Sequence, residues 1–112
     1  MSGVLYRLAD DGETPIQIDH TIDDDMRAWS ESIGRRVAQT YVGRRYVSTV
    51  FLGADHQYDP SGPPLLWESM TFSPDGTSID CERYSSLADA RAGHAAMVAK
   101  WSEEADGGTE RL

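Results

Sequence analysis

The sequence predicts a single α+β domain, in which an antiparallel sheet is accompanied by two amphipathic helices. Two observations predict this class. Apolar residues recur every three or four positions in two segments, which is typical of helices, and short runs rich in β-branched and aromatic residues alternate with Gly- and Pro-containing turns. The 112 residues suffice for one hydrophobic core. We expect the element order β-β-α-β-β-β-α, a domain over residues 1–102 and a flexible tail over 103–112.

The chain is predicted to start with a β-hairpin. Val4, Tyr6 and Leu8 alternate with smaller or polar residues, as in a strand with one buried face. Residues 10–12, Asp-Asp-Gly, supply turn chemistry, and residues 15–18 return as the second strand.

The first helix is predicted over residues 22–39, weakened at Gly34. Three consecutive aspartates at positions 23–25 suit the positive end of a helix dipole. The apolar residues on one face of this helix are Ile22, Met26, Trp29, Ile33 and Val37.

The middle of the chain predicts a three-stranded antiparallel meander. Residues 46–52 are rich in Val, Thr and aromatic residues, which favours a largely covered strand. A Pro- and Gly-rich loop over 54–64 follows, and a second strand is expected at 65–72. The Ser-Pro-Asp-Gly turn at 73–76 leads into a third strand at 79–84.

A second helix begins after the meander. Ser86 and Asp89 have capping-box-like spacing at its start. One face of this helix carries Leu87, Ala90, His94, Met97, Val98 and Trp101. We expect the helix to cover the sheet and to bury Leu87, Met97, Val98 and Trp101.

Composition narrows the class of protein. A net charge of −9 opposes general binding of nucleic acid, because the phosphate backbone is repelled. We find no membrane-spanning stretch and no secretory signal, so we expect no membrane association and a cytoplasmic location.

The single cysteine, Cys81, excludes an internal disulfide and a multi-thiolate zinc site. Its acidic neighbours, Asp80 and Glu82, raise a thiol pKa and argue against a thiol enzyme.

The charge is unevenly distributed. Residues 1–25 carry seven acids against one arginine, whereas residues 26–46 carry five arginines against one acid. Two readings remain open: the arginines pair with nearby aspartates on a solvated face, or they bind an anion or an acidic partner surface. The candidate partner-binding residues are Arg35, Arg36, Arg44 and Arg45.

Five residues form a candidate polar site. Glu68 and His94 lie on faces that are otherwise apolar, so each needs a partner, and His94 or Arg83 could supply one for Glu68. Asp55 and His56 follow a predicted strand and could join them if the second helix crosses the sheet there. The group is either a structural polar network or a weak metal candidate, because imidazole and carboxylate bind zinc, manganese or iron. No recognised metal motif is present, so we predict no metal, no cofactor and no catalytic residue.

Four blocks of sequence carry a resemblance: STVFLGADH at 48–56, GPPLLWESM at 62–70, ERYS at 82–85 and GH at 93–94. In this order and with these gaps, the chain resembles a group of short uncharacterised proteins of actinobacteria and their phages. The resemblance covers about residues 46–100 and brings no activity with it. It implies a bacterial or phage-infected bacterial cytoplasm.

Together these observations favour a small acidic accessory or regulatory protein that binds a protein partner over an enzyme. A sharper version is an inhibitor that mimics DNA, which requires carboxylates spaced like phosphates on one face. A homodimer is also compatible with the sequence. The alternative from another class is a metal-dependent hydrolase that uses Asp55, His56, Glu68 and His94.

Overall fold

A computed structural model describes residues 4–19, 21–54 and 62–110, with side chains through Glu103. It confirms the α+β class, and its element order is β-β-α-β-β-β-β-α. The elements are β1 (Tyr6–Leu8), β2 (Pro15–Gln17), α1 (Asp23–Ser32), β3 (Arg36–Val42), β4 (Arg45–Phe51), β5 (Trp67–Phe72), β6 (Ser78–Tyr84) and α2 (Leu87–Glu110). The predicted hairpin, the three later strands and both helices are present, and β3 is one strand more than predicted.

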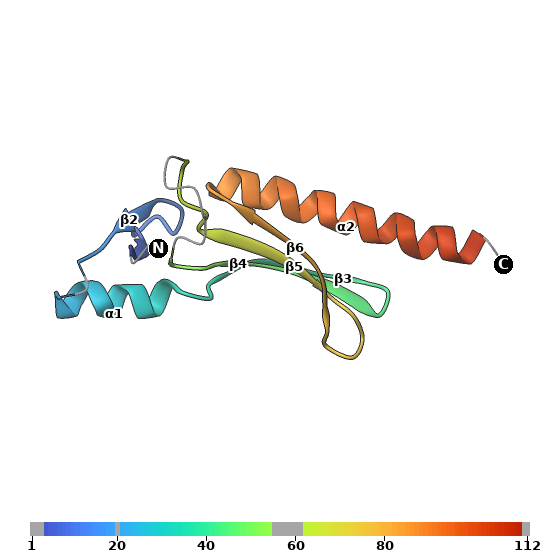
Figure 1. The fold of residues 1–112 in the computed structure, drawn as a ribbon, viewed down its shortest axis with the longest axis horizontal. Helices are drawn as coiled ribbons and strands as arrows, with labels where there is room; N and C mark the ends of the chain where they lie inside the picture. The colour runs from blue at the N-terminus through green and yellow to red at the C-terminus, as the bar shows by residue number, and fades with distance from the viewer. Residues whose placement is uncertain (1–3, 20, 55–61, 111–112) are drawn as a thin grey trace.

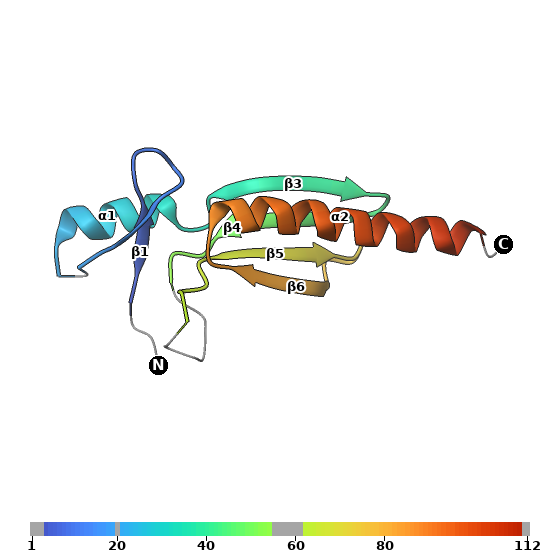
Figure 2. The same cartoon turned by 90° about the horizontal axis from the view of Figure 1, so that it is seen from above.

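The strands form two antiparallel sheets. β1 and β2 make a two-stranded sheet, and β3, β4, β5 and β6 make a four-stranded sheet in chain order. α2 covers one face of the four-stranded sheet, whereas none of the residues that the structure describes forms a helix on the opposite face (Figure 1). Seen from above, α2 runs along the middle of the sheet, with β3 and β6 at the two borders (Figure 2).

The boundary between α1 and β3 corrects the sequence prediction. The helix ends at Ser32, whereas we predicted it to residue 39. Gly34 adopts a φ of +72°, which terminates the helix, and its N–H donates to Phe51 O at 2.8 Å. β3 then pairs with β4 in antiparallel register, so long-range pairing overrides the helical spacing of Val37.

A two-residue turn joins β3 to β4. Val42 pairs with Arg45, and Gly43 and Arg44 form the turn between them. Gly43 has a φ of +62° while no described non-glycine residue has a positive φ, which is the pattern of a type II′ hairpin turn. Such a turn places a mutually hydrogen-bonded residue pair at its base and so fixes which backbone groups of β3 point away from β4.

The core lies between the sheet and α2. Its largest fully buried side chains include Trp67, Phe51 and Leu66, and the first two rings meet edge to face with centroids 5.2 Å apart. From α2, the predicted burial of Leu87 and Met97 is confirmed. Val98 and Trp101 are only partly buried and pack at the margin of the core.

α2 is capped at its start and is joined to β6 by hydrogen bonds further along. Ser86 Oγ accepts the Asp89 N–H at 3.0 Å, as the capping spacing predicted. Further along, Asp80 Oδ2 on β6 accepts from Trp101 Nε1 at 3.0 Å and from Lys100 Nζ at 3.1 Å.

The residues that we predicted as a flexible tail after residue 102 continue α2 to Glu110. Helix formers at the start of this segment, Glu103, Glu104 and Ala105, extend the preceding helix. Within the described ranges, neither helix combines the length and the apolar character needed to cross a membrane.

The N-terminal unit of β1, β2 and α1 lies at one end of the four-stranded sheet (Figure 1). Ser32 Oγ accepts the Leu8 N–H at 3.0 Å and ties α1 to β1. Trp29 Nε1 donates to Gly53 O at 2.9 Å, which attaches α1 to the end of β4. The first contact holds the N-terminal unit together, and the second holds that unit against the four-stranded sheet.

Candidate functional site

Glu68 and Arg83 form an ion pair on neighbouring strands. Arg83 Nε donates to Glu68 Oε2 at 3.0 Å, and the two residues face each other in the β5–β6 register. The Glu68 residue is 9% exposed, and the Cys81 thiol also donates to its Oε2 at 3.4 Å. The expectation of a buried Glu68 with a side-chain partner is confirmed, and among the two proposed partners it is Arg83.

His94 takes part in a separate network beneath α2. Its Nε2 lies 2.9 Å from Thr40 Oγ1, and its Nδ1 lies 2.7 Å from Thr49 Oγ1. Thr49 Oγ1 also contacts Ser69 Oγ on the next strand. A neutral imidazole has one donor and one acceptor nitrogen, and hydroxyl groups can satisfy both. The network therefore connects α2 to three strands of the sheet.

The expected meeting of Glu68 and His94 does not occur. Ser69 reaches the His94 network through Thr49, so Ser69 faces α2. Successive side chains of a strand point to opposite faces, so Glu68 points to the helix-free face. The α2 helix does cover the sheet as predicted, but the alternation of side chains along β5 puts the Glu68 carboxylate on the other face.

Asp55 and His56 lie outside the described residues. Among residues 4–19, 21–54 and 62–103, no group of three His, Cys, Asp or Glu side chains converges in a way that could hold a metal ion. Of the four residues proposed for the hydrolase, the two that the structure describes are separated by the sheet.

Cys81 gives a direct test of the Glu68 environment. Burial raises the pKa of the Cys81 thiol, and the negative charge and hydrogen bond of Glu68 raise it further. We expect this sole cysteine to react with iodoacetamide more slowly than free cysteine at pH 8, because less thiolate is present. Glu68→Gln should increase the rate at which Cys81 reacts with iodoacetamide. Equal rates in the wild type and the variant would show that Glu68 does not raise the pKa of the Cys81 thiol.

The four candidate arginines divide into two pairs. Arg35 and Arg36 lie at the start of β3, whereas Arg44 and Arg45 lie at the turn that ends it. The two pairs lie at opposite ends of β3, a strand of seven residues that rises about 3.3 Å per residue. The Arg45 guanidinium lies over the Trp101 ring, 5.0 Å from its centroid, and the other three arginines are exposed.

The edges of the four-stranded sheet differ in charge. β6 carries Asp80, Glu82 and Arg83 within the strand, and charged side chains discourage pairing at a sheet edge. β3 has no charged residue and no proline from Val37 to Val42. It packs extensively only on β4 and α2, so its outer edge is uncovered by the rest of the described chain.

Backbone groups on this edge can be assigned from the register. Val42 and Arg45 close the two-residue turn as a hydrogen-bonded pair, and such pairs alternate along the ladder. Gln39 and Tyr41 therefore direct their N–H and C=O groups away from β4.

The helix-free face next to this edge carries aromatic side chains. Tyr46 stacks on Phe72 with centroids 5.0 Å apart, and Tyr41 lies 5.7 Å from Tyr46. Tyr41 is 72% exposed at the edge of this row. Tyr41 lies at a border of the sheet because β3, the strand that the sequence did not predict, is an edge strand.

A pocket of about 200 Å³ lies at the other end of β3. Loop 11–13, the start of β3, the core and the second turn of α2 all contribute to its lining. Arg35 and Arg36 line it together with Arg91 and Glu13, which the sequence interpretation did not single out. Both additional residues are exposed charged side chains of an ordinary kind, so only the fold shows that they are close to the arginine pair.

Comparison with protein-family models, with curated proteins and with solved structures returned no match.

Proposed function

We propose that this protein is a small acidic accessory or regulatory protein of the cytoplasm that binds an extended segment of a partner protein along the edge strand β3. The observation that supports this proposal is the uncovered, uncharged edge of β3 between Val37 and Val42. An extended peptide can add to such an edge, where main-chain hydrogen bonds provide affinity and alternate side chains provide specificity. The free thiol of Cys81 accords with a reducing compartment.

The arginines define the chemistry of the proposed partner. Arg35 and Arg36 precede the uncharged stretch, and Arg44 and Arg45 follow it. Positive charge at both ends of a neutral strand suits a segment with acidic residues at both ends and uncharged residues between them. The overall charge of −9 makes this basic border distinct from the rest of the chain.

The same arginines disfavour a second copy at this edge. In an antiparallel pair of two β3 strands, the Arg36 end of one copy would lie beside the Arg44 end of the other. Like charges placed opposite each other in a sheet are destabilising. We therefore propose a different protein, and not a homodimer, as the occupant of the edge.

A synthetic peptide can test the proposal before a natural partner is known. The probe has two aspartates at each end and alternating threonine and valine between them. We expect its addition to shift the amide resonances of Gln39 and Tyr41 and to slow their hydrogen exchange, because these N–H groups become hydrogen-bonded. A peptide with lysines in place of the aspartates should bind much more weakly.

Two variants separate the backbone and charge contributions. Gln39→Pro removes one outward N–H, which an edge strand tolerates, and should reduce affinity at least tenfold. The double change Arg36→Gln and Arg44→Gln should reduce it about fivefold, since exposed charges each contribute modestly. Arg27→Gln alters an exposed arginine on α1 and serves as a single-charge control. Peptide binding that persists in Gln39→Pro, or that shifts β6 in place of β3, would overturn the proposal.

A further inference from the structure

The pocket beside the start of β3 brings three arginines to one place. Arg35 and Arg36 come from the chain entering β3, and Arg91 comes from the second turn of α2. The Arg35 guanidinium lies against the 11–13 loop, where a Cβ added to Gly12 would be 3.1 Å from its Nη2. The apolar side chains that line the same pocket are Leu8, Val37, Phe51, Trp67 and Leu87.

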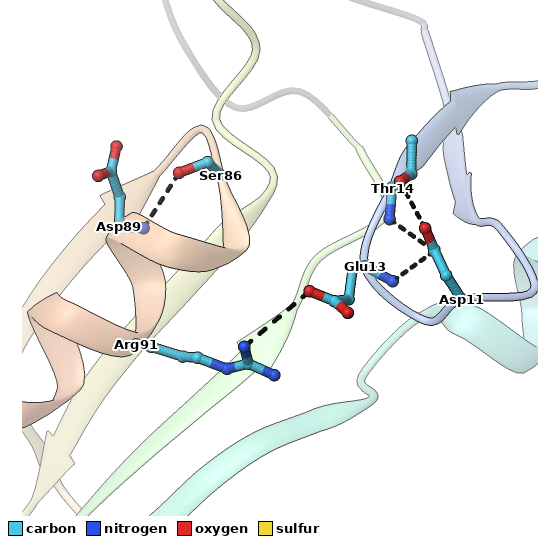
Figure 3. Close-up of polar contacts among 6 residues, drawn as sticks. All are labelled: Asp11, Glu13, Thr14, Ser86, Asp89 and Arg91. Atoms are coloured by element: carbon cyan, nitrogen blue, oxygen red, sulfur yellow. Dashed lines mark hydrogen bonds and ion pairs between the residues drawn. The ribbon is translucent and has the colours of Figure 1, made fainter.

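The carboxylates of Asp11 and Glu13 also line the pocket. The Asp11 carboxylate is already hydrogen-bonded within its own loop. Its Oδ1 accepts from the N–H groups of Glu13 at 2.8 Å and Thr14 at 2.9 Å, and its Oδ2 accepts from Thr14 Oγ1 at 2.7 Å. These hydrogen bonds lower the pKa of Asp11, so it stays ionised while it stabilises the turn. Figure 3 shows the Asp11 carboxylate directed toward the backbone of Glu13 and toward Thr14.

The Glu13 side chain extends from the 11–14 loop toward Arg91 on α2 (Figure 3). Its Oε1 lies 4.0 Å from Arg91 Nη1, and both side chains are more than half exposed, at 59% and 64%. An ion pair of this length and exposure contributes little to stability. Arg35 and Arg36 make no ion pair with any residue of the described ranges.

From this geometry we infer that the pocket binds a small organic carboxylate, whose charged group replaces the Glu13 carboxylate beside Arg91. Three arginines against two ionised acids leave one positive charge, which a monoanion neutralises. Arginine suits this role because its guanidinium donates two parallel hydrogen bonds to a carboxylate. Polar atoms make up most of the exposed lining, so the charged group of the ligand makes the main contacts, and the volume of about 200 Å³ limits the ligand to about one aromatic ring. This site shares Arg35 and Arg36 with the proposed peptide-binding edge of β3, whereas Arg91 and Glu13 belong to the pocket alone.

Benzoate is the probe, and benzamide is its neutral control of the same shape. In an NMR titration at millimolar concentration, benzoate should shift the amide resonances of Gly12, Arg36 and Arg91, whereas benzamide should not. Inorganic phosphate, which carries more charge than the single positive charge left in the pocket, should shift them less than benzoate does.

Two substitutions at exposed positions should act in opposite directions. Arg91→Gln should weaken benzoate binding about tenfold or more, the usual effect of losing a charge-assisted hydrogen bond. Glu13→Gln should strengthen it about two- to fivefold, because the competing carboxylate is removed while the loop bond from its backbone N–H remains. Arg27→Gln changes the same charge away from the pocket and should leave affinity unchanged.

The results that would overturn carboxylate binding differ from those that would overturn peptide binding at the β3 edge. Absence of benzoate shifts, equal shifts with benzamide, or stronger shifts with phosphate would overturn the carboxylate assignment. Unchanged affinity in Arg91→Gln would place any binding elsewhere. Because Glu13 and Arg91 lie outside β3, a failure here leaves peptide binding at Gln39 and Tyr41 untouched, and the converse also holds.

Discussion

Replacing Trp67 with alanine is expected to lower the free energy of unfolding by about 3–5 kcal/mol. The Trp67 ring is 1% exposed and lies in the cluster that joins β4, β5 and the start of α2. Its removal deletes the edge-to-face contact with Phe51 and leaves a cavity between the sheet and Leu87. A loss of this size is a large fraction of the stability of a domain of this length.

Urea denaturation followed by circular dichroism measures the effect. Tyr41→Ala is the matched control, because it removes an aromatic side chain that is 72% exposed and should cost less than about 1 kcal/mol. Trp67→Phe keeps a ring in the core and should fall between the two, which gives a measurable value if Trp67→Ala fails to fold. Equal losses in Trp67→Phe and Tyr41→Ala would show that the Trp67 site is not the centre of the core.

Much of the fold could be predicted from local signals. The runs that became β4, β5 and β6 combine β-branched residues with strong turn chemistry at residues 73–76, and the capping serine marks the start of α2. The segment from Ile33 to Val37 misled the interpretation, because its apolar spacing fits a helix. Only the pairing of residues 36–42 with β4 and the positive φ of Gly34 decide in favour of a strand.

The site was less predictable, for a different reason. Glu68 was correctly expected to need a buried partner, and Arg83 lies opposite it on the next strand. The predicted contact between Glu68 and His94 depended on which face of β5 carries Glu68, since a shift of one residue moves a side chain to the other face. Arg91 and Glu13 approach each other across 78 positions of the chain, and exposed charges carry no local signal of such a contact.

The His94 network predicts a dependence of stability on pH. Burial lowers the pKa of His94 below its ordinary value, because the charged imidazolium is poorly solvated beneath α2. The groups that face it are the hydroxyls of Thr40 and Thr49, with Ser69 behind them, and none carries a charge to stabilise a proton. The unfolded chain therefore binds a proton on His94 at a higher pH than the folded chain does.

This difference sets the sign of the effect. Above about pH 7.5 the imidazole is neutral in both states, and His94 contributes its full hydrogen bonding to Thr40 and Thr49. As the pH falls through about 6.5, the unfolded state becomes protonated first, and stability is lost until the pH passes the lowered pKa of the folded state.

The substitution His94→Leu separates the hydrogen bonds from the titration. At pH 7.5 it should lower the free energy of unfolding by about 1–3 kcal/mol, because the hydroxyls of Thr40 and Thr49 lose a buried partner. Between pH 7.5 and 5, urea denaturation should show a smaller loss of stability in the variant than in the wild type, since the variant has no imidazole at this position. Both proteins keep His20 and His56, so the difference between the two pH profiles isolates His94. Parallel profiles would mean that His94 has the same proton affinity in the folded and unfolded chains, and that its hydroxyl partners stabilise the imidazolium as well as they stabilise the neutral ring.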